Sequence, residues 1–220
     1  MKKDLTEIVF ILDRSGSMSG LEADTIGGFN SLIEKQKRKK DKALVSTVLF
    51  DDTCTVIHDR KGLYQIRPLT EKDYYVRGCT ALLDSLGGAI HHIGNLHKYT
   101  REKDRPEKTL FIIITDGMEN SSKRYTYREV KQMVERQKEK YGWEFLFLGA
   151  NIDAVAEVER FGIRRDRAVN YNCDSVGTAV NYKALSKAIS NVRNCESAER
   201  MDEALCEWDS EIRVDYKSRK

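Results

Sequence analysis

Two aspartates that each follow an apolar run are the residues best suited to binding a cation. Asp13 follows the run Glu7–Leu12, and Asp116 follows the run Thr109–Thr115. Short, almost continuous apolar runs are typical of strands that are buried on both faces, as in parallel sheets. In such sheets ligands bind outside the carboxyl ends of the strands. We therefore expect the two carboxylates to lie close together at one edge of the sheet.

Three hydroxyl groups accompany these carboxylates. Ser15 and Ser17 follow Asp13 at alternate positions, and Gly16 lets the backbone turn tightly between them. Thr80 stands just ahead of a predicted helix. Oxygen ligands of this kind favour Mg²⁺, Mn²⁺ or Ca²⁺ over zinc, which prefers nitrogen and sulfur. We predict a metal site formed by Asp13, Ser15, Ser17, Thr80 and Asp116, with a coordination position left open for a ligand.

The order of these segments resembles the metal-ion-dependent adhesion site of von Willebrand factor A domains. The matching pieces are Asp-x-Ser-x-Ser from Asp13, Gly-x-Thr ending at Thr80, and Thr-Asp-Gly around Asp116. The resemblance covers roughly residues 5–195. It implies that Asp13 and the serines contact the metal, that Thr80 adds a hydroxyl, and that Asp116 binds directly or through water. The segment Gly20–Leu32 is similar to stand-alone bacterial or phage-encoded members.

Strand-like and helix-like patterns alternate along the chain, which predicts an α/β fold with a mostly parallel sheet between two layers of helices. Ala43–Phe50 and Thr53–His58 are linked so closely that we expect an antiparallel hairpin at one edge. The family resemblance implies the same three-layer, Rossmann-like fold. The remaining predicted elements are helices at 81–96, 127–141, 153–161 and 175–193, strands at 144–149 and 167–171, and an early helix that contains Phe29.

The resemblance implies a von Willebrand factor A domain at residues 1–195, followed by a C-terminal segment at 196–220. Met201, Leu205, Trp208 and Ile212 recur there at helical spacing, which predicts an amphipathic helix. We interpret it as a helix packed on the domain, and a partner-binding helix is the alternative. We expect Asp153 to cap a helix N-terminus.

Charge and composition exclude several classes of function. The net charge of the 220 residues is +3, too small to indicate nucleic-acid binding. The basic run 35–42, with Lys40 at its centre, is typical of a helix C-terminus. No apolar run reaches the roughly 18 residues that a membrane span needs. Five scattered cysteines without a Cys-x-x-Cys pair indicate reduced thiols in the cytoplasm. We expect a monomer.

The resemblance implies a non-enzymatic binding module whose metal accepts an Asp or Glu side chain from a protein partner. We assign no catalytic residue. We expect the rim of the contact to consist of five residues that flank the ligand loops: Arg14, Met18, Ser19, Asn120 and Ser121.

Two other functions fit the residues less well. A Mg²⁺-dependent phosphohydrolase could use Asp13 as its nucleophile, but the haloacid dehalogenase type needs a second aspartate two residues later, where Ser15 stands. Nucleotide binding is also disfavoured, because the segment Gly16–Gly20 matches neither a dinucleotide-binding glycine motif nor a Walker loop.

Overall fold

A six-stranded sheet forms the centre of the molecule, with the strand order β3-β2-β1-β4-β5-β6. The computed structural model describes residues 1–39 and 41–219. All neighbouring strands are parallel except β3, which is antiparallel to β2, so the predicted edge hairpin is confirmed. The strands are β1 (Lys2–Asp13), β2 (Lys42–Phe50), β3 (Cys54–Gly62), β4 (Pro106–Thr115), β5 (Glu144–Gly149) and β6 (Ala168–Asn170).

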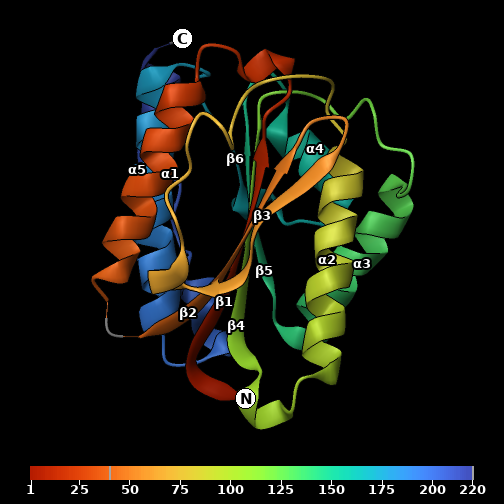
Figure 1. Cartoon of the computed structure of the whole chain (residues 1–220), viewed down its shortest axis with the longest axis vertical. Helices are drawn as coiled ribbons and strands as arrows, with labels where there is room; N and C mark the ends of the chain where they lie inside the picture. The colour runs from red at the N-terminus through yellow and green to blue at the C-terminus, as the bar shows by residue number, and fades with distance from the viewer. Residues whose placement is uncertain (40, 220) are drawn as a thin grey trace.

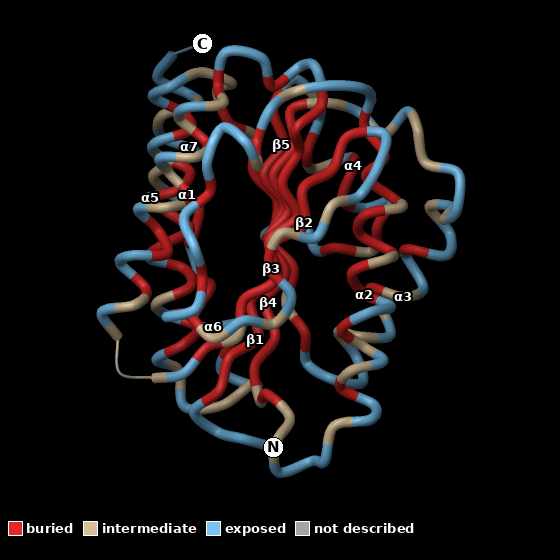
Figure 2. The backbone as a smooth tube through the Cα atoms, viewed as in Figure 1, coloured by how far each residue is buried: buried red, intermediate tan, exposed pale blue. Residues whose placement is uncertain are grey.

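Helices cover both faces of the sheet, as the alternating pattern predicted (Figure 1). One face packs against α1 (Glu22–Lys37) and α5 (Ser175–Asn194). The other packs against α2 (Leu82–Tyr99), α3 (Tyr127–Tyr141) and α4 (Ala154–Phe161). Figure 2 shows the buried residues concentrated along the sheet and on the inner sides of the helices. In the described part of the chain, no helix is both long and apolar enough to cross a bilayer.

The central strand β1 shows why these segments are apolar without interruption. Its side chains alternate between the two faces, so Phe10 and Leu12 join the core under α1 and α5, whereas Val9 and Ile11 join the core under α2 and α3. Both faces are covered, and therefore every one of these positions is buried. Burial of each such side chain stabilises the fold by about 1.5–3 kcal/mol.

The C-terminal segment packs on the domain, but it is not the single helix that its spacing predicted. It forms α6 (Met201–Ala204) and α7 (Ser210–Ser218), and Glu207 between them has a φ of 52°. The helical path therefore stops, and yet the predicted apolar side chains, among them Leu205 and Trp208, are buried against the core that contains α1 and α5. Lys40 of the basic run and Lys220 of this segment lie outside the described residues.

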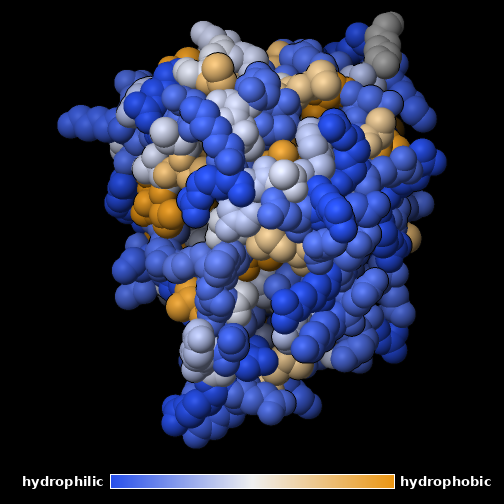
Figure 3. All heavy atoms as spheres, turned by 90° about the vertical axis from the view of Figure 1, so that its right-hand side faces the viewer, coloured by the Kyte–Doolittle hydropathy of each residue, from blue (hydrophilic) through white to orange (hydrophobic). Residues whose placement is uncertain are grey.

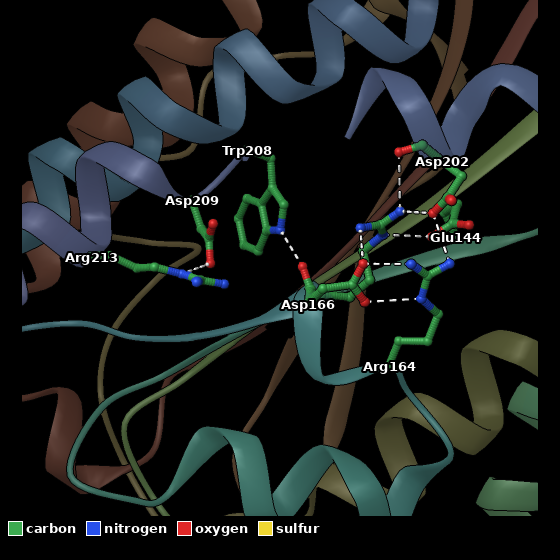
Figure 4. A network of polar contacts seen from close by, with 8 residues as sticks. Glu144, Arg164, Asp166, Asp202, Trp208, Asp209 and Arg213 are labelled. Carbon is green, nitrogen blue, oxygen red and sulfur yellow. Dashed lines mark hydrogen bonds and ion pairs between the residues drawn. The ribbon is translucent and has the colours of Figure 1, made fainter. Parts of the chain in front are cut away.

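Polar contacts hold the same segment in place (Figure 4). The indole Nε1 of Trp208 donates to the carbonyl oxygen of Asp166 at 3.1 Å. Arg167 is buried, and its guanidinium pairs with Glu144 and with Asp202 of α6. Since these partners come from β5, from the turn before β6 and from α6, the network joins the C-terminal segment to the edge of the sheet.

The N-terminus of α4 is capped as the sequence predicted. The Asp153 carboxylate accepts a hydrogen bond from the backbone N–H of Ala156 at 3.0 Å. We expect Asp153→Ala to lower the free energy of unfolding by about 1 kcal/mol, because one helix-end donor loses its acceptor. Urea denaturation measures this, with Asp153→Ser as the control that keeps a capping oxygen. An alanine variant as stable as the serine variant would contradict the prediction.

Candidate metal centre

The loop that follows β1 places two serine hydroxyls beside the carboxylate of Asp13. One oxygen of Asp13 accepts the backbone N–H of Ser15 at 2.7 Å, and the other accepts the hydroxyl of Thr115 at 2.6 Å. A short 3₁₀ turn at Gly16–Met18 then brings the hydroxyl oxygen of Ser17 to 3.1 Å from that of Ser15. The loop therefore presents one carboxylate and two hydroxyls together.

Asp116 and Thr80 reach the same place from distant parts of the chain. The Ser17 hydroxyl donates to Asp116 Oδ1 at 2.5 Å, across 99 residues of sequence. A Cβ added to Gly117 would lie 3.2 Å from Thr80 Oγ1 and 3.4 Å from Ser17 Oγ, so both hydroxyls border this glycine. The structure thus brings together all five residues predicted as metal ligands.

The two carboxylates are buried. Asp13 and Asp116 are only 1% and 2% exposed. Burial raises the pKa of Asp13 to about 6, against the opposing effect of the hydrogen bonds from Thr115 and Ser15. Burial likewise raises the pKa of Asp116. Among the described residues, neither carboxylate forms an ion pair. A divalent cation would supply the missing charge.

Asn120 holds the Thr80 segment in position. Its side-chain oxygen accepts the backbone N–H of Thr80 at 2.9 Å, and its backbone N–H donates to the Thr80 carbonyl at 3.1 Å. Nearby, Glu119 accepts the N–H of Leu83, and Asp84 accepts the N–H of Arg124. These bonds hold the loop after β4 against the start of α2, and they therefore fix the position of Thr80 relative to Asp116.

A third buried acid, Asp51, anchors the loops around the site. Its Oδ2 accepts Arg14 Nε at 2.7 Å and Arg77 Nε at 2.8 Å. Its Oδ1 accepts the N–H and the hydroxyl of Thr53, each at 2.8 Å. Burial alone would raise the pKa of Asp51, but the hydrogen bonds from Arg77 and Thr53 lower it to about 2. Asp51 therefore joins the Ser15–Ser17 loop, the hairpin turn and the segment before Thr80.

The predicted rim is only partly at the surface. Arg14 is 2% exposed and pairs with Asp51, and Met18 is 3% exposed, so neither can contact a partner as we expected. Ser19 and Asn120 are exposed, and Ser121 is half-buried. Arg14 is buried because its partner lies on a neighbouring strand end, 37 residues away in sequence.

Sequence reasoning overlooked two residues of the site. Thr115 was part of the recognised motif, but its hydroxyl binds Asp13 rather than only ending β4. Cys173 lies with its sulfur 3.6 Å from Asp116 Oδ2, and burial together with this carboxylate raises the pKa of the thiol to about 12. The position of Thr115 beside the strand-ending Asp116 could have indicated its role. Nothing in the local sequence points to Cys173.

The donor set fits a hard divalent cation. The groups that converge are two carboxylates and three hydroxyls, all oxygen donors of the kind that Mg²⁺, Mn²⁺ and Ca²⁺ take. Across residues 1–39 and 41–219, no cluster of three or more His, Cys, Asp or Glu side chains could hold a metal ion. A metal ion held here would need the hydroxyls of Ser15, Ser17 and Thr80 in addition to the two acids.

Comparisons of sequence identify no relatives: no protein-family model matches the chain, and no curated protein is similar to it. Comparisons of structure find many similar folds. A von Willebrand factor type A structure from Catenulispora acidiphila has a TM-score of 0.55 at 14% identity, over 82% of this chain and 42% of that one. The ArnB paralog VWA2 from Sulfolobus acidocaldarius has a TM-score of 0.54 at 15% identity, over 86% and 45%.

A third similar structure is the manganese-loaded TRAP protein of Plasmodium vivax. Its TM-score is 0.53 at 16% identity, over 82% of this chain and 73% of that chain. The chain spans about half the length of the first solved structures that it matches. At such low identity the likeness concerns the fold alone. The chain therefore shares the three-layer α/β fold of a group of solved structures that includes von Willebrand factor A domains.

Proposed function

We propose that the chain is a non-enzymatic protein-binding module that depends on a divalent metal ion. Asp13, Ser15, Ser17, Thr80 and Asp116 hold the ion, and the ion accepts an Asp or Glu side chain of a partner. When bound, the ion supplies positive charge and an open coordination position at the surface. Mg²⁺ is the first choice of metal, with Mn²⁺ or Ca²⁺ as the alternatives.

The observation that carries this proposal is the pair of buried carboxylates, Asp13 and Asp116, neither of which pairs with a basic side chain among the described residues. The positive charge of Arg14 is not available to them, because Asp51 already binds it. Manganese in the structurally similar TRAP protein supports the use of a metal in this fold.

The surface beside the proposed metal suits a peptide partner. A hollow of about 750 Å³ begins at Ser17 and is bordered by Met118, Asn151 and Tyr171. Met118 is 61% exposed, so it offers an apolar contact next to the charged site. With Ser19, Asn120 and Ser121 it forms the proposed rim. We further propose that the module acts as a cytoplasmic monomer, consistent with its five free cysteines.

Calorimetry with Mg²⁺ and Mn²⁺ tests the proposal, using the wild type and a Ser15→Ala/Ser17→Ala variant. We expect the wild type to bind the metal and the variant to lose at least about tenfold in affinity, because two oxygen donors disappear. Ser19→Ala is the matched control, since Ser19 lies in the same loop and is exposed. Equal affinities in all three proteins would exclude the proposed site.

A phosphatase assay with para-nitrophenyl phosphate separates this function from the phosphohydrolase alternative. We expect no turnover in the presence of Mg²⁺, either in the wild type or in Asp13→Ala. Metal-dependent turnover that disappears in Asp13→Ala would overturn the binding-module proposal.

The affinity for Mg²⁺ will depend on pH. The pKa of Asp13 is about 6 without metal, so below pH 6 the ion must displace a proton from this carboxyl. We expect the affinity to be constant above pH 7 and to fall by about tenfold per pH unit below pH 6. Calorimetry at pH 5, 6, 7 and 8 at constant ionic strength measures this, and the same affinity at pH 5 and pH 7 would contradict it.

A further inference from the structure

A second feature that could bind a ligand lies at the opposite end of the sheet. A cavity of about 430 Å³ is bordered by the last turns of α2 and α3, by Arg105 ahead of β4 and by Trp143 ahead of β5. These residues surround the amino ends of the strands, whereas Asp13 and Asp116 lie at the carboxyl ends. Figure 3 faces the side of the molecule covered by α2 and α3 and shows a predominantly hydrophilic surface.

The lining of this cavity is cationic. Lys98, Arg105 and Arg136 contribute three positive charges, and no Asp or Glu is among the lining residues. His91 and His97 add two imidazoles, of which His97 is bonded to the buried Glu7 at 3.2 Å. In the part of the chain that the structure describes, none of the three cations forms an ion pair with an acid. Lys98 and Arg136 are exposed, so solvent screens their charges, whereas Arg105 is half-buried and its charge favours an anion beside it.

Helix dipoles explain only part of this arrangement. Cations near helix C-termini complement the partial negative charge there, and Lys98 in the last turn of α2 fits that role. Arg105 does not, because it stands in a loop and its Nε is buried without a hydrogen-bond acceptor. A buried donor left without an acceptor destabilises the protein, so its position beside the cavity points to an acceptor from outside the chain.

The rest of the lining suits a planar organic group. Tyr141 is 38% exposed beside Arg136, and Asn95 and Gln137 add amides that can both donate and accept hydrogen bonds. Trp143 forms a fixed wall, since its ring stacks on Phe111 at 5.3 Å between ring centroids. The volume lies within the range of about 300–1,000 Å³ that is typical of small-molecule sites.

We propose that this cavity binds a small organic phosphate. The guanidinium groups of Arg105 and Arg136 hold the phosphate, because their planar arrays of donors match its oxygens. Tyr141 and the amides of Asn95 and Gln137 contact the organic part. The site is separate from the proposed metal centre and does not need it.

Calorimetry of the full chain with adenosine monophosphate tests the proposal. EDTA is present throughout, so that no divalent metal at Asp13 can bind the phosphate. We expect the nucleotide to bind, inorganic phosphate to compete more weakly, and adenosine not to bind. Arg105→Gln and Arg136→Gln should each weaken the binding of the nucleotide by at least tenfold, and Asp13→Asn should leave it unchanged.

Two further variants serve as controls for the loss of charge. Arg101→Gln changes the same loop as Arg105, and Arg128→Gln changes the same helix as Arg136, but neither residue borders the cavity. We expect both to keep the wild-type affinity within twofold. The proposal is overturned if the wild type does not bind the nucleotide, if the Arg105 and Arg136 variants bind it as well as the wild type, or if the control variants lose the same affinity.

Discussion

Asp13→Asn will lose about 100-fold or more in affinity for Mg²⁺, and without metal it will be more stable than the wild type at pH 7. The loss of affinity follows from the donor set, in which Asp13 is one of only two charged ligands. An amide oxygen carries no negative charge, so the variant offers a single carboxylate to a doubly charged ion. The effect on the metal exceeds that of removing hydroxyls, which are neutral.

The gain in stability follows from the burial of Asp13. Its pKa is 3.8 in the unfolded chain and about 6 in the fold, so the metal-free fold is progressively destabilised as the pH rises from about 4 to 6. At pH 7 the full cost is present, and a shift of this size corresponds to about 3 kcal/mol. Asparagine avoids the buried charge, and we therefore expect the free energy of unfolding to increase by about 1–3 kcal/mol.

Urea denaturation with EDTA and with saturating Mg²⁺ measures both effects in one experiment. We expect added Mg²⁺ to stabilise the wild type and to leave Asp13→Asn unchanged. Asp52→Asn is the control, because Asp52 is an exposed acid at the same end of the sheet. Stabilisation of the Asp13 variant by Mg²⁺ would show that the ion binds elsewhere.

Asp51→Ala will lower the free energy of unfolding by about 3–5 kcal/mol, the cost of leaving one partner of a buried ion pair alone. Arg14 is 2% exposed and has Asp51 as its acidic partner at 2.7 Å, so the variant leaves a guanidinium buried without a counter-charge. The same change also removes the acceptor shared by Arg77 and Thr53. Mg²⁺ affinity should fall as well, because the loops that carry Ser15 and Thr80 lose their common anchor.

A double variant distinguishes the lost pair from a general defect in folding. Arg14→Met added to Asp51→Ala removes the uncompensated charge and should recover part of the stability. The two single variants, the double variant and the wild type together form a cycle that denaturation with urea can measure. A loss below about 1 kcal/mol in Asp51→Ala would contradict the role assigned to this residue.

For elements with a clear apolar pattern and clear end signals, the first and last residues were predictable from the sequence. The bounds of α3 and β5 agree with the prediction, because α3 has Thr126 as its N-cap and Gly142 at its end, and β5 is a short apolar run. The strand β1 begins five residues earlier than expected. Backbone hydrogen bonds hold its polar start, such as the bond from the Lys2 N–H to the Arg105 carbonyl. Such bonds leave no apolar pattern in the sequence from which they could be predicted.

The convergence of the five candidate ligands was predictable because each belongs to a strand end or a loop with its own short motif. The rim was not, since its exposure depends on contacts between distant segments. Arg14 is adjacent to Asp13, and only the position of Asp51 decides that it faces inward. The break between α6 and α7 has the same origin: the apolar spacing continues through Leu205 and Trp208, but tertiary contacts such as the one from Trp208 to Asp166 favour an irregular path.

The ends of the chain lie at opposite poles of the molecule, and this decides how it can be tethered. Tyr216 of α7 borders the hollow that begins at Ser17, whereas Lys2 bonds to Arg105 at the other pole (Figure 1). A bead or sensor surface attached beside Arg219 will crowd the proposed metal centre and leave the cationic cavity open to solution. Attachment through Met1 will do the reverse, so the orientation on a surface selects which of the two sites is presented.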